Sequence, residues 1–189
     1  HVLNLLRLAQ AFDRSVDWRW LRRIANRLKA RATPARQKEP RLRSSQELFK
    51  LGLQLMTTAA NPVLRRTRDA PLIQYRDGLV IALLAARPIR LRNLGAIVIG
   101  EHLNRVSSEY WLRFAASETK NSRPLEFPLP RSLDNNVSHY LRRVRPQLLA
   151  GTASHKLWIA TGGRPMPDKT LYERVIRRTR YAFGKSISP

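Results

Sequence analysis

Residues 85–94 read AARPIRLRNL, and this segment decides the fold around it. The residues before it, from Pro71 to Ala86, carry apolar side chains at helical spacing, and proline is favoured in the first turn of a helix. After Leu94 the pattern changes to strand-like segments. The segment therefore predicts a helix-to-helix corner that carries Arg90.

Residues 118–123 read ETKNSR and form the second informative segment. Strand-like residues flank this segment, at 110–114 before it and at 125–129 after it, and a further strand is expected at 96–99. Together they predict a small antiparallel sheet. Its second hairpin loop holds Lys120.

Helical spacing accounts for most of the remaining chain. Asp17 is placed to cap a helix that has an apolar stripe and a basic face. Ser44 and Glu47 predict a capping box at the start of another helix. Further helical patterns lie at residues 3–12, at residues 137–148 and from Asp168 onward. We therefore expect a mainly α chain with a small antiparallel β-sheet, of the α+β class.

The charge of the chain indicates its partner. It carries 36 lysine and arginine residues against 13 acidic residues, a formal net charge of +23. This excess favours a polyanion, and nucleic acid is the usual one. A membrane surface is the weaker rival, because no apolar run approaches the roughly 20 residues of a spanning helix, and solvated helix faces are the remaining explanation. The expected partner is double-stranded DNA, with no membrane and no small-molecule substrate.

The sequence offers no motif for a metal or a cofactor. It contains no cysteine, which excludes disulfides and thiolate zinc sites, and its four histidines lack ligand spacing. It also has no glycine-rich phosphate loop and no serine-centred elbow. We therefore expect neither a metal nor a cofactor.

Besides Arg90 and Lys120, a set of basic residues is expected to contact the DNA phosphates. These residues lie on predicted helix faces, in a basic linker, at the corner and in the hairpin loop. The set is Arg22, Arg23, Arg27, Arg41, Arg43, Arg87, Arg92, Arg123, Arg177, Arg178 and Lys185.

These segments resemble the tyrosine recombinases, which are also called phage-integrase-type site-specific recombinases. Residues 75–84, YRDGLVIALL, are similar to the helix before that family's first catalytic arginine, and residues 89–94 are similar to its Leu-Arg-Ile-Ser-Glu-Leu box. Residues 118–129 resemble its lysine hairpin. The resemblance implies that Arg90 and Lys120 are catalytic. A surface arginine paired with a carboxylate and a solvated turn lysine are the structural alternatives for these two residues.

The resemblance covers residues 70 to 189 and also implies a domain organisation. Residues 1–31 would be the C-terminal part of a helical core-binding domain, and residues 32–43 a basic linker. Residues 44–189 would be a partial catalytic domain. The family acts as a tetramer on DNA, so the resemblance implies a homo-oligomeric parent in the bacterial cytoplasm, associated with the nucleoid.

The chain departs from the family pattern at several positions. Pro88 stands where the family usually has glycine, and Asn93 stands where it usually has glutamate. The family's His-x-x-Arg box, its later His or Trp and its nucleophilic tyrosine have no match up to Pro189, and we expect them beyond it. None of the tyrosines in the sequence lies where the nucleophile is expected.

Two functions are consistent with these observations. The first is a DNA-binding fragment of a site-specific tyrosine recombinase or integrase, which cleaves and rejoins DNA through a 3′-phosphotyrosyl intermediate. In a complete site, arginines hold the phosphate oxygens and the lysine protonates the departing 5′-oxygen. The second is a DNA-binding module that never cuts, either a decayed integrase or a regulator. The chain as it stands is expected neither to cleave nor to join DNA, because a clamp without a nucleophile cannot open a phosphodiester.

Overall fold

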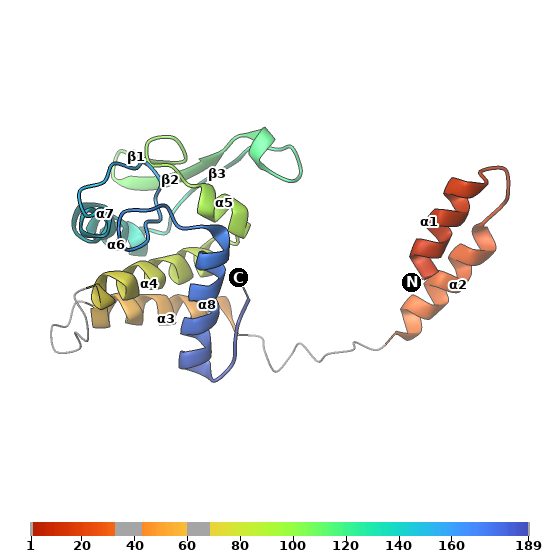
Figure 1. Cartoon of the computed structure of the whole chain (residues 1–189), viewed down its shortest axis with the longest axis horizontal. Coiled ribbons are helices and arrows are strands. Elements are labelled where there is room, and N and C mark those ends of the chain that lie inside the picture. The colour runs from red at the N-terminus through yellow and green to blue at the C-terminus, as the bar shows by residue number, and fades with distance from the viewer. Residues whose placement is uncertain (1, 33–42, 60–68, 189) are drawn as a thin grey trace. The chain divides into compact units, whose positions relative to one another are not determined.

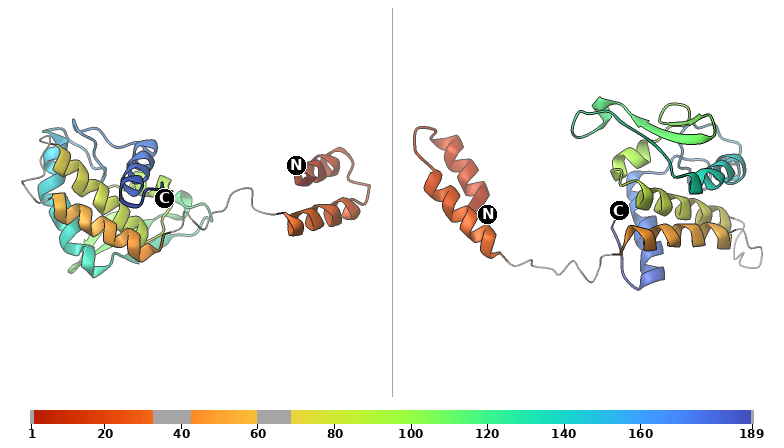
Figure 2. Two further views of the ribbon diagram at one scale, coloured as in Figure 1. Left: turned by 90° about the horizontal axis from the view of Figure 1, so that it is seen from below. Right: turned by 180° about the vertical axis from the view of Figure 1, so that it is seen from behind.

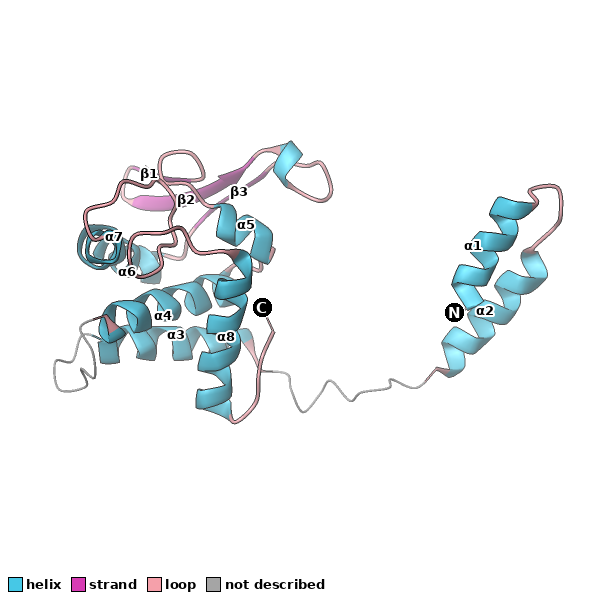
Figure 3. Ribbon diagram, viewed as in Figure 1, coloured by secondary structure: helices cyan, strands magenta, loops and turns pink. Residues whose placement is uncertain are grey.

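Helices dominate the structure, and one small antiparallel sheet accompanies them, as the sequence predicts (Figure 3). The computed structural model describes residues 2–32, 43–59 and 69–188. Most of the expected linker, residues 33–42 with Arg41 among them, lies outside the described residues. The chain divides into two compact units, residues 1–40 and residues 41–189 (Figure 1).

The first unit holds helices α1 (Val2–Phe12) and α2 (Arg19–Arg31). The predicted capping residue Asp17 lies one position before the N-cap Trp18, and its carboxylate accepts a hydrogen bond from the backbone N–H of Arg19 at 2.9 Å. Two short helices cover little apolar surface. Large apolar side chains of both helices are therefore exposed, namely Leu3, Leu5, Leu8, Phe12, Trp20, Ile24 and Leu28.

The second unit begins with helix α3 (Ser45–Ala59). Ser44 and Glu47 form the predicted capping box at its start. The backbone N–H of Glu47 donates to Ser44 Oγ at 3.1 Å, and the backbone N–H of Ser44 donates to Glu47 Oε2 at 2.8 Å. Each side chain satisfies a backbone donor of the other residue, and the prediction of this helix start is confirmed.

Helix α4 (Ala70–Ala86) packs along α3 at the centre of the second unit (Figure 2). The two backbones meet at a pair of glycines. A Cβ atom added to Gly52 would lie 2.6 Å from the carbonyl oxygen of Gly78, and one added to Gly78 would lie 2.7 Å from the carbonyl oxygen of Gly52. Every residue of α4 from Tyr75 to Leu83 is buried, as expected of a helix that is apolar nearly all round. Because α4 is buried, it holds the start of the corner that follows it in a fixed position.

The sheet contains three antiparallel strands in the order β1-β2-β3. They are β1 (Leu103–Val106), β2 (Glu109–Phe114) and β3 (Leu125–Pro128). The register pairs Leu103 with Leu112 and Arg113 with Glu126. The two strands that flank the loop of Lys120 are those that the sequence predicts.

The first strand is not where the sequence predicts it. In residues 96–99, Val98 makes a single bridge to Lys156 and Ile99 a single bridge to Leu103. Gly100, with a φ of +87°, turns the chain at this point, and β1 begins after that turn. The apolar run that suggested a strand is explained by burial instead, since Ile97 is fully buried in the core. Ile159 likewise makes only a single bridge, to Pro165.

The remaining helices complete the core of the second unit. They are the short α5 (Leu91–Ala96), α6 (Asp134–His139), a π-helical stretch (Tyr140–Val144), α7 (Arg145–Leu149) and α8 (Asp168–Phe183). Helix α8 lies across α4 (Figure 1). The buried indole of Trp158 donates to the carbonyl oxygen of Leu94 at 2.9 Å, which ties the core to α5 directly after the corner.

Candidate functional site

Arg90 lies at a corner between α4 and α5, as the sequence predicts. Pro88 is the physical cause, because a residue before proline avoids the helical conformation. Arg87 is accordingly extended, with φ of −138° and ψ of 106°, and α4 ends at Ala86. Arg90 is the N-cap of α5, also with extended backbone, while Ile89 between them is buried and anchors the corner. The Arg90 side chain is left exposed.

The loop between β2 and β3 lies opposite this corner. Residues from both segments line one cavity of about 470 Å³, which we call the site cavity. The corner contributes Pro88, Ile89, Arg90 and Asn93, and the loop contributes Thr119, Asn121, Arg123, Pro124 and Leu125. The structure therefore brings together the two segments that the sequence singles out. Lys120 is exposed in the same loop but is not among the residues that line the cavity.

The loop that carries Lys120 is closed by Thr119. Its hydroxyl group donates to the carbonyl oxygen of Arg123 at 2.6 Å and accepts from the backbone N–H of Arg123 at 3.1 Å. The backbone N–H of Ser122 donates to the carbonyl oxygen of Thr119 at 3.2 Å, and Ser122 has a φ of +50°. These contacts fold residues 119–123 into a tight turn with Lys120 near its tip.

A partly buried polar network joins the loop to the corner. Asn93, on α5, donates through Nδ2 to the backbone carbonyl oxygen of Glu118 at 3.1 Å. The carboxylate of Glu118 contacts His102 Nε2 at 2.7 Å. The hydrogen bond to His102 is the largest cause that lowers the pKa of Glu118, and a hydrogen bond from the backbone N–H of Ala115 is the next. Neither His102 nor Glu118 was predicted as a site residue.

Arg87 has a structural role beside its predicted DNA contact. Its guanidinium donates through Nε and Nη2 to the carbonyl oxygen of Pro128, at 3.2 and 3.1 Å, and it stacks over the ring of Phe127. The side chain therefore fastens the corner to strand β3. Arg92 and Arg123 are both exposed, and Arg123 lines the site cavity.

The other predicted DNA contacts differ in how they are placed. On α2, in the first unit, Arg22, Arg23 and Arg27 are exposed. Arg43 is exposed, contacts Glu47 at 3.4 Å and lies over the ring of Phe183. Arg177 and Lys185 are exposed in the second unit, and Arg41 is not described. Arg178 lies mostly inside the protein, with 19% of its side chain exposed, and contacts a buried carboxylate.

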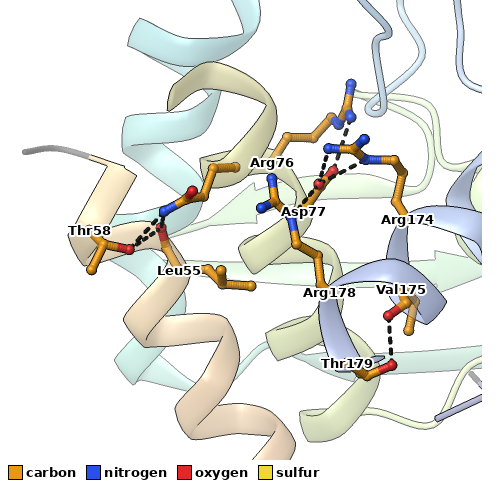
Figure 4. A network of polar contacts seen from close by, with 9 residues as sticks. Leu55, Thr58, Arg76, Asp77, Arg174, Val175, Arg178 and Thr179 are labelled. Carbon is orange, nitrogen blue, oxygen red and sulfur yellow. Dashed lines mark hydrogen bonds and ion pairs between the residues drawn. The ribbon is translucent and has the colours of Figure 1, made fainter. Parts of the chain in front are cut away.

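That carboxylate belongs to Asp77, which is 1% exposed and gathers three guanidinium groups around it (Figure 4). Arg76, its neighbour on α4, contacts Oδ1 at 3.0 Å. Arg174 and Arg178 of α8 contact Oδ2 at 2.6 and 2.9 Å. We call these four residues the Asp77 cluster. One sequence signal could have found it: Arg76 and Asp77 are charged residues in a largely apolar helix, and charged residues are seldom fully buried unless they are paired.

The hydroxyl groups of the buried tyrosines are occupied away from the site cavity. The hydroxyl of Tyr75 contacts the carbonyl oxygen of Asn136, that of Tyr110 contacts Ser138 Oγ, and that of Tyr140 contacts the carbonyl oxygen of Leu157. Burial raises the pKa of Tyr140, so its hydroxyl stays protonated at neutral pH. Tyr172 and Tyr181 are exposed on α8. Among the residues that the structure describes, no tyrosine lines the site cavity.

A second, apolar cavity of about 330 Å³ lies on the other side of Arg90. It shares Pro88, Ile89 and Arg90 with the site cavity, and its other walls come from α3, α4, α8 and the residues after α8. Arg90 therefore borders both cavities.

No similarity to a known protein accounts for this arrangement. Comparison of the chain with protein-family models, with curated proteins and with solved structures found no match. Within residues 2–32, 43–59 and 69–188, no helix is long and apolar enough to cross a bilayer, and no three potential metal ligands gather. The site cavity between the corner and the loop is thus the feature that carries a functional argument.

Proposed function

We propose that this chain binds duplex DNA and holds one phosphodiester in the site cavity, in a site of the tyrosine-recombinase type. One observation carries the proposal: Arg90 lines the same cavity as Arg123 and other residues of the loop between β2 and β3, in a chain of net charge +23. A phosphate there would meet cations from both walls. The remaining positive charge would bind the DNA backbone on either side without regard to sequence.

Arg90 in the cavity wall and Lys120 in the adjoining loop suit a phosphodiester in different ways. Arg90 offers a fork of donors that stays charged and matches two phosphate oxygens. Lys120 is a flexible point charge that can give up a proton to a departing oxygen. In a recombinase these roles would be the phosphate clamp and the general acid. A site with both groups could bind a phosphodiester and then polarise it.

A binding module that does not cut is the second candidate, and the placement of the tyrosines favours it for this chain. The described tyrosines bond within the core or lie on α8, so none is in position to attack a phosphate held by Arg90. Without an attacking oxygen the site can hold a phosphodiester but cannot open it.

Salt dependence tests the DNA-binding part of the proposal. Affinity for a short duplex should fall steeply between about 50 and 200 mM salt, because each neutralised phosphate releases condensed counterions. Arg90→Ala should lower the slope of log affinity against log salt by about 1, the contribution of one phosphate contact. Arg105→Ala, an exposed cation on β1 outside the site cavity, is the matched control and should keep the slope. A flat salt dependence of the unaltered chain would refute DNA binding.

A suicide DNA substrate separates the two candidates. We expect no covalent protein–DNA product from this chain. A product that disappears when one of the five tyrosines is changed to phenylalanine would instead show that the chain cleaves DNA.

A further inference from the structure

We propose that Glu118 is a positioning residue that holds the turn of Lys120 opposite Arg90. The inference rests on the proposed function, and it assigns to Glu118 a role beyond that of the two cations. Glu118 touches neither cation. It acts through the backbone that leads to Lys120, two residues later in the chain.

Both the backbone and the side chain of Glu118 are engaged. Its backbone N–H donates to the carbonyl oxygen of Ala115 at 3.0 Å, and its carbonyl oxygen accepts from Asn93 at 3.1 Å. Its Oε1 contacts His102 Nε2 at 2.7 Å, and its Oε2 accepts from the backbone N–H of Ala115, also at 2.7 Å. The residue is thus tied to the corner, to the sheet and to its own short helical turn.

His102 makes this anchor rigid. The backbone N–H of Val98 donates to His102 Nδ1 at 3.1 Å, so Nδ1 is the acceptor and Nε2 carries the proton that is donated to Glu118. His102 is 4% exposed and its ring packs against Phe114 of β2. The Glu118 carboxylate is therefore held by a side chain that is itself fixed in the core.

Asn93 connects the anchor to Arg90. It lies in the first turn of α5, three residues after Arg90, and its amide reaches across to the loop. Lys120, Asn121 and Ser122 are exposed, so the tip of the turn receives its position through Thr119 and Glu118. Among the hydrogen bonds described between α5 and the loop, only the one from Asn93 to Glu118 connects the segment of Arg90 with the segment of Lys120.

A purely electrostatic role for Glu118 makes the opposite prediction. Removing one carboxylate from a DNA-binding surface raises its positive charge and should strengthen DNA binding. Removing a positioning group should instead weaken the contact of Lys120 with a phosphate. The sign of the change in DNA affinity therefore distinguishes the two roles.

Glu118→Gln is the sharpest variant. Both carboxylate oxygens of Glu118 face N–H donors, so an amide would place its own N–H₂ against one of them. Glu126→Gln is the matched control, because it removes the same charge from β3 of the same hairpin, where Glu126 pairs with Arg113 at 2.7 Å. Asn93→Ala is a second variant that leaves the net charge unchanged.

The experiment measures duplex affinity against salt for these variants, for Lys120→Ala and for the double variants with Lys120→Ala. Glu118→Gln and Asn93→Ala should each lower the salt slope by about 1, as Lys120→Ala does. Neither should lower it further in the Lys120→Ala background, because coupled residues are not additive. A slope for Glu118→Gln equal to that of Glu126→Gln, or additive losses in the double variants, would overturn the positioning role.

Amide hydrogen exchange tests the same idea without DNA. Exchange of the Arg123 amide should quicken in Glu118→Gln and in Asn93→Ala and stay unchanged in Glu126→Gln, while amides of α3 and α4 report that each variant is folded. Failure of the unaltered chain to bind DNA would refute the proposed function. Unchanged exchange of the Arg123 amide in Glu118→Gln and Asn93→Ala would separately refute the positioning role of Glu118.

Discussion

The guanidinium of Arg174 donates two hydrogen bonds to a single carboxylate oxygen of Asp77, from Nε at 2.9 Å and from Nη2 at 2.6 Å. The pair spans 97 residues of sequence and fastens α8 to α4. Burying a carboxylate is costly unless charged donors replace its water, and here three arginines do so. Asp77 thus helps to hold α8, which contributes Val175 to the apolar cavity beside Arg90.

Asp77→Asn should destabilise the second unit by about 3–5 kcal/mol, the usual cost of removing one partner from a buried ion pair. Three guanidinium groups would remain around a neutral amide. Urea unfolding measures the change, with Glu126→Gln as the surface control at about 0.2–1 kcal/mol. Equal losses for the two variants would show that the cluster contributes no more than a surface pair.

Gly52→Ala should also destabilise the second unit, by about 1–3 kcal/mol, although alanine is favoured over glycine in helices by about 1 kcal/mol. The added Cβ would lie 2.6 Å from the backbone carbonyl oxygen of Gly78, so the two helices must separate. Thermal unfolding checks the sign. A rise in melting temperature would mean that helix propensity outweighs the close approach.

Thr119→Val and Thr119→Ser form a matched pair for the loop. Valine keeps the shape but removes the hydroxyl that closes the turn on Arg123, whereas serine keeps the hydroxyl. We expect faster exchange of the Arg123 amide and a smaller salt slope of DNA binding with valine, and restoration of both by serine. Identical behaviour of the two variants would show that the hydroxyl group does not determine the closure of the turn.

The pKa of Glu118 should be measurable as an acid transition below the ordinary glutamate value of about 4.3. The hydrogen bond from His102 and that from the Ala115 N–H lower this pKa in the folded chain. The contribution of Glu118 to the stability of the fold is therefore complete above its pKa in the unfolded chain. It is lost as the pH falls through its pKa in the folded chain.

Carbon-13 NMR of the Glu118 carboxyl group gives the midpoint of this transition. His102→Leu should move the midpoint upward, since it removes the largest cause of the shift. A midpoint that does not respond to this substitution would contradict the hydrogen bond to His102.

The corner and the hairpin were predictable because both depend on local chemistry. Pro88 forces Arg87 out of the helix, and β2, the strand before Lys120, carries alternating buried side chains. The capping box of Ser44 and Glu47 is equally local. These features require only neighbouring residues, so a single sequence specifies them.

The rest depends on partners far apart in the chain. The apolar run of residues 96–99 has the composition of a strand, but tertiary burial of Ile97 and the turn at Gly100 determine its conformation. His102, Glu118 and Asn93 form a network only because the sheet and α5 meet. Arg174 and Arg178 belong to a basic helix that the sequence assigns to solvent or DNA, and only the position of Asp77 shows why they turn inward.

The long span of the Asp77–Arg174 contact has a consequence for biosynthesis. Ribosomes add about 5–20 residues per second, so roughly 5–20 s separate the synthesis of Asp77 from that of Arg174. During most of this interval α4 has been synthesised, and Arg76 is the one arginine of the Asp77 cluster that is present to neutralise the carboxylate. Helix α4 therefore remains partly uncovered until α8 has left the ribosome.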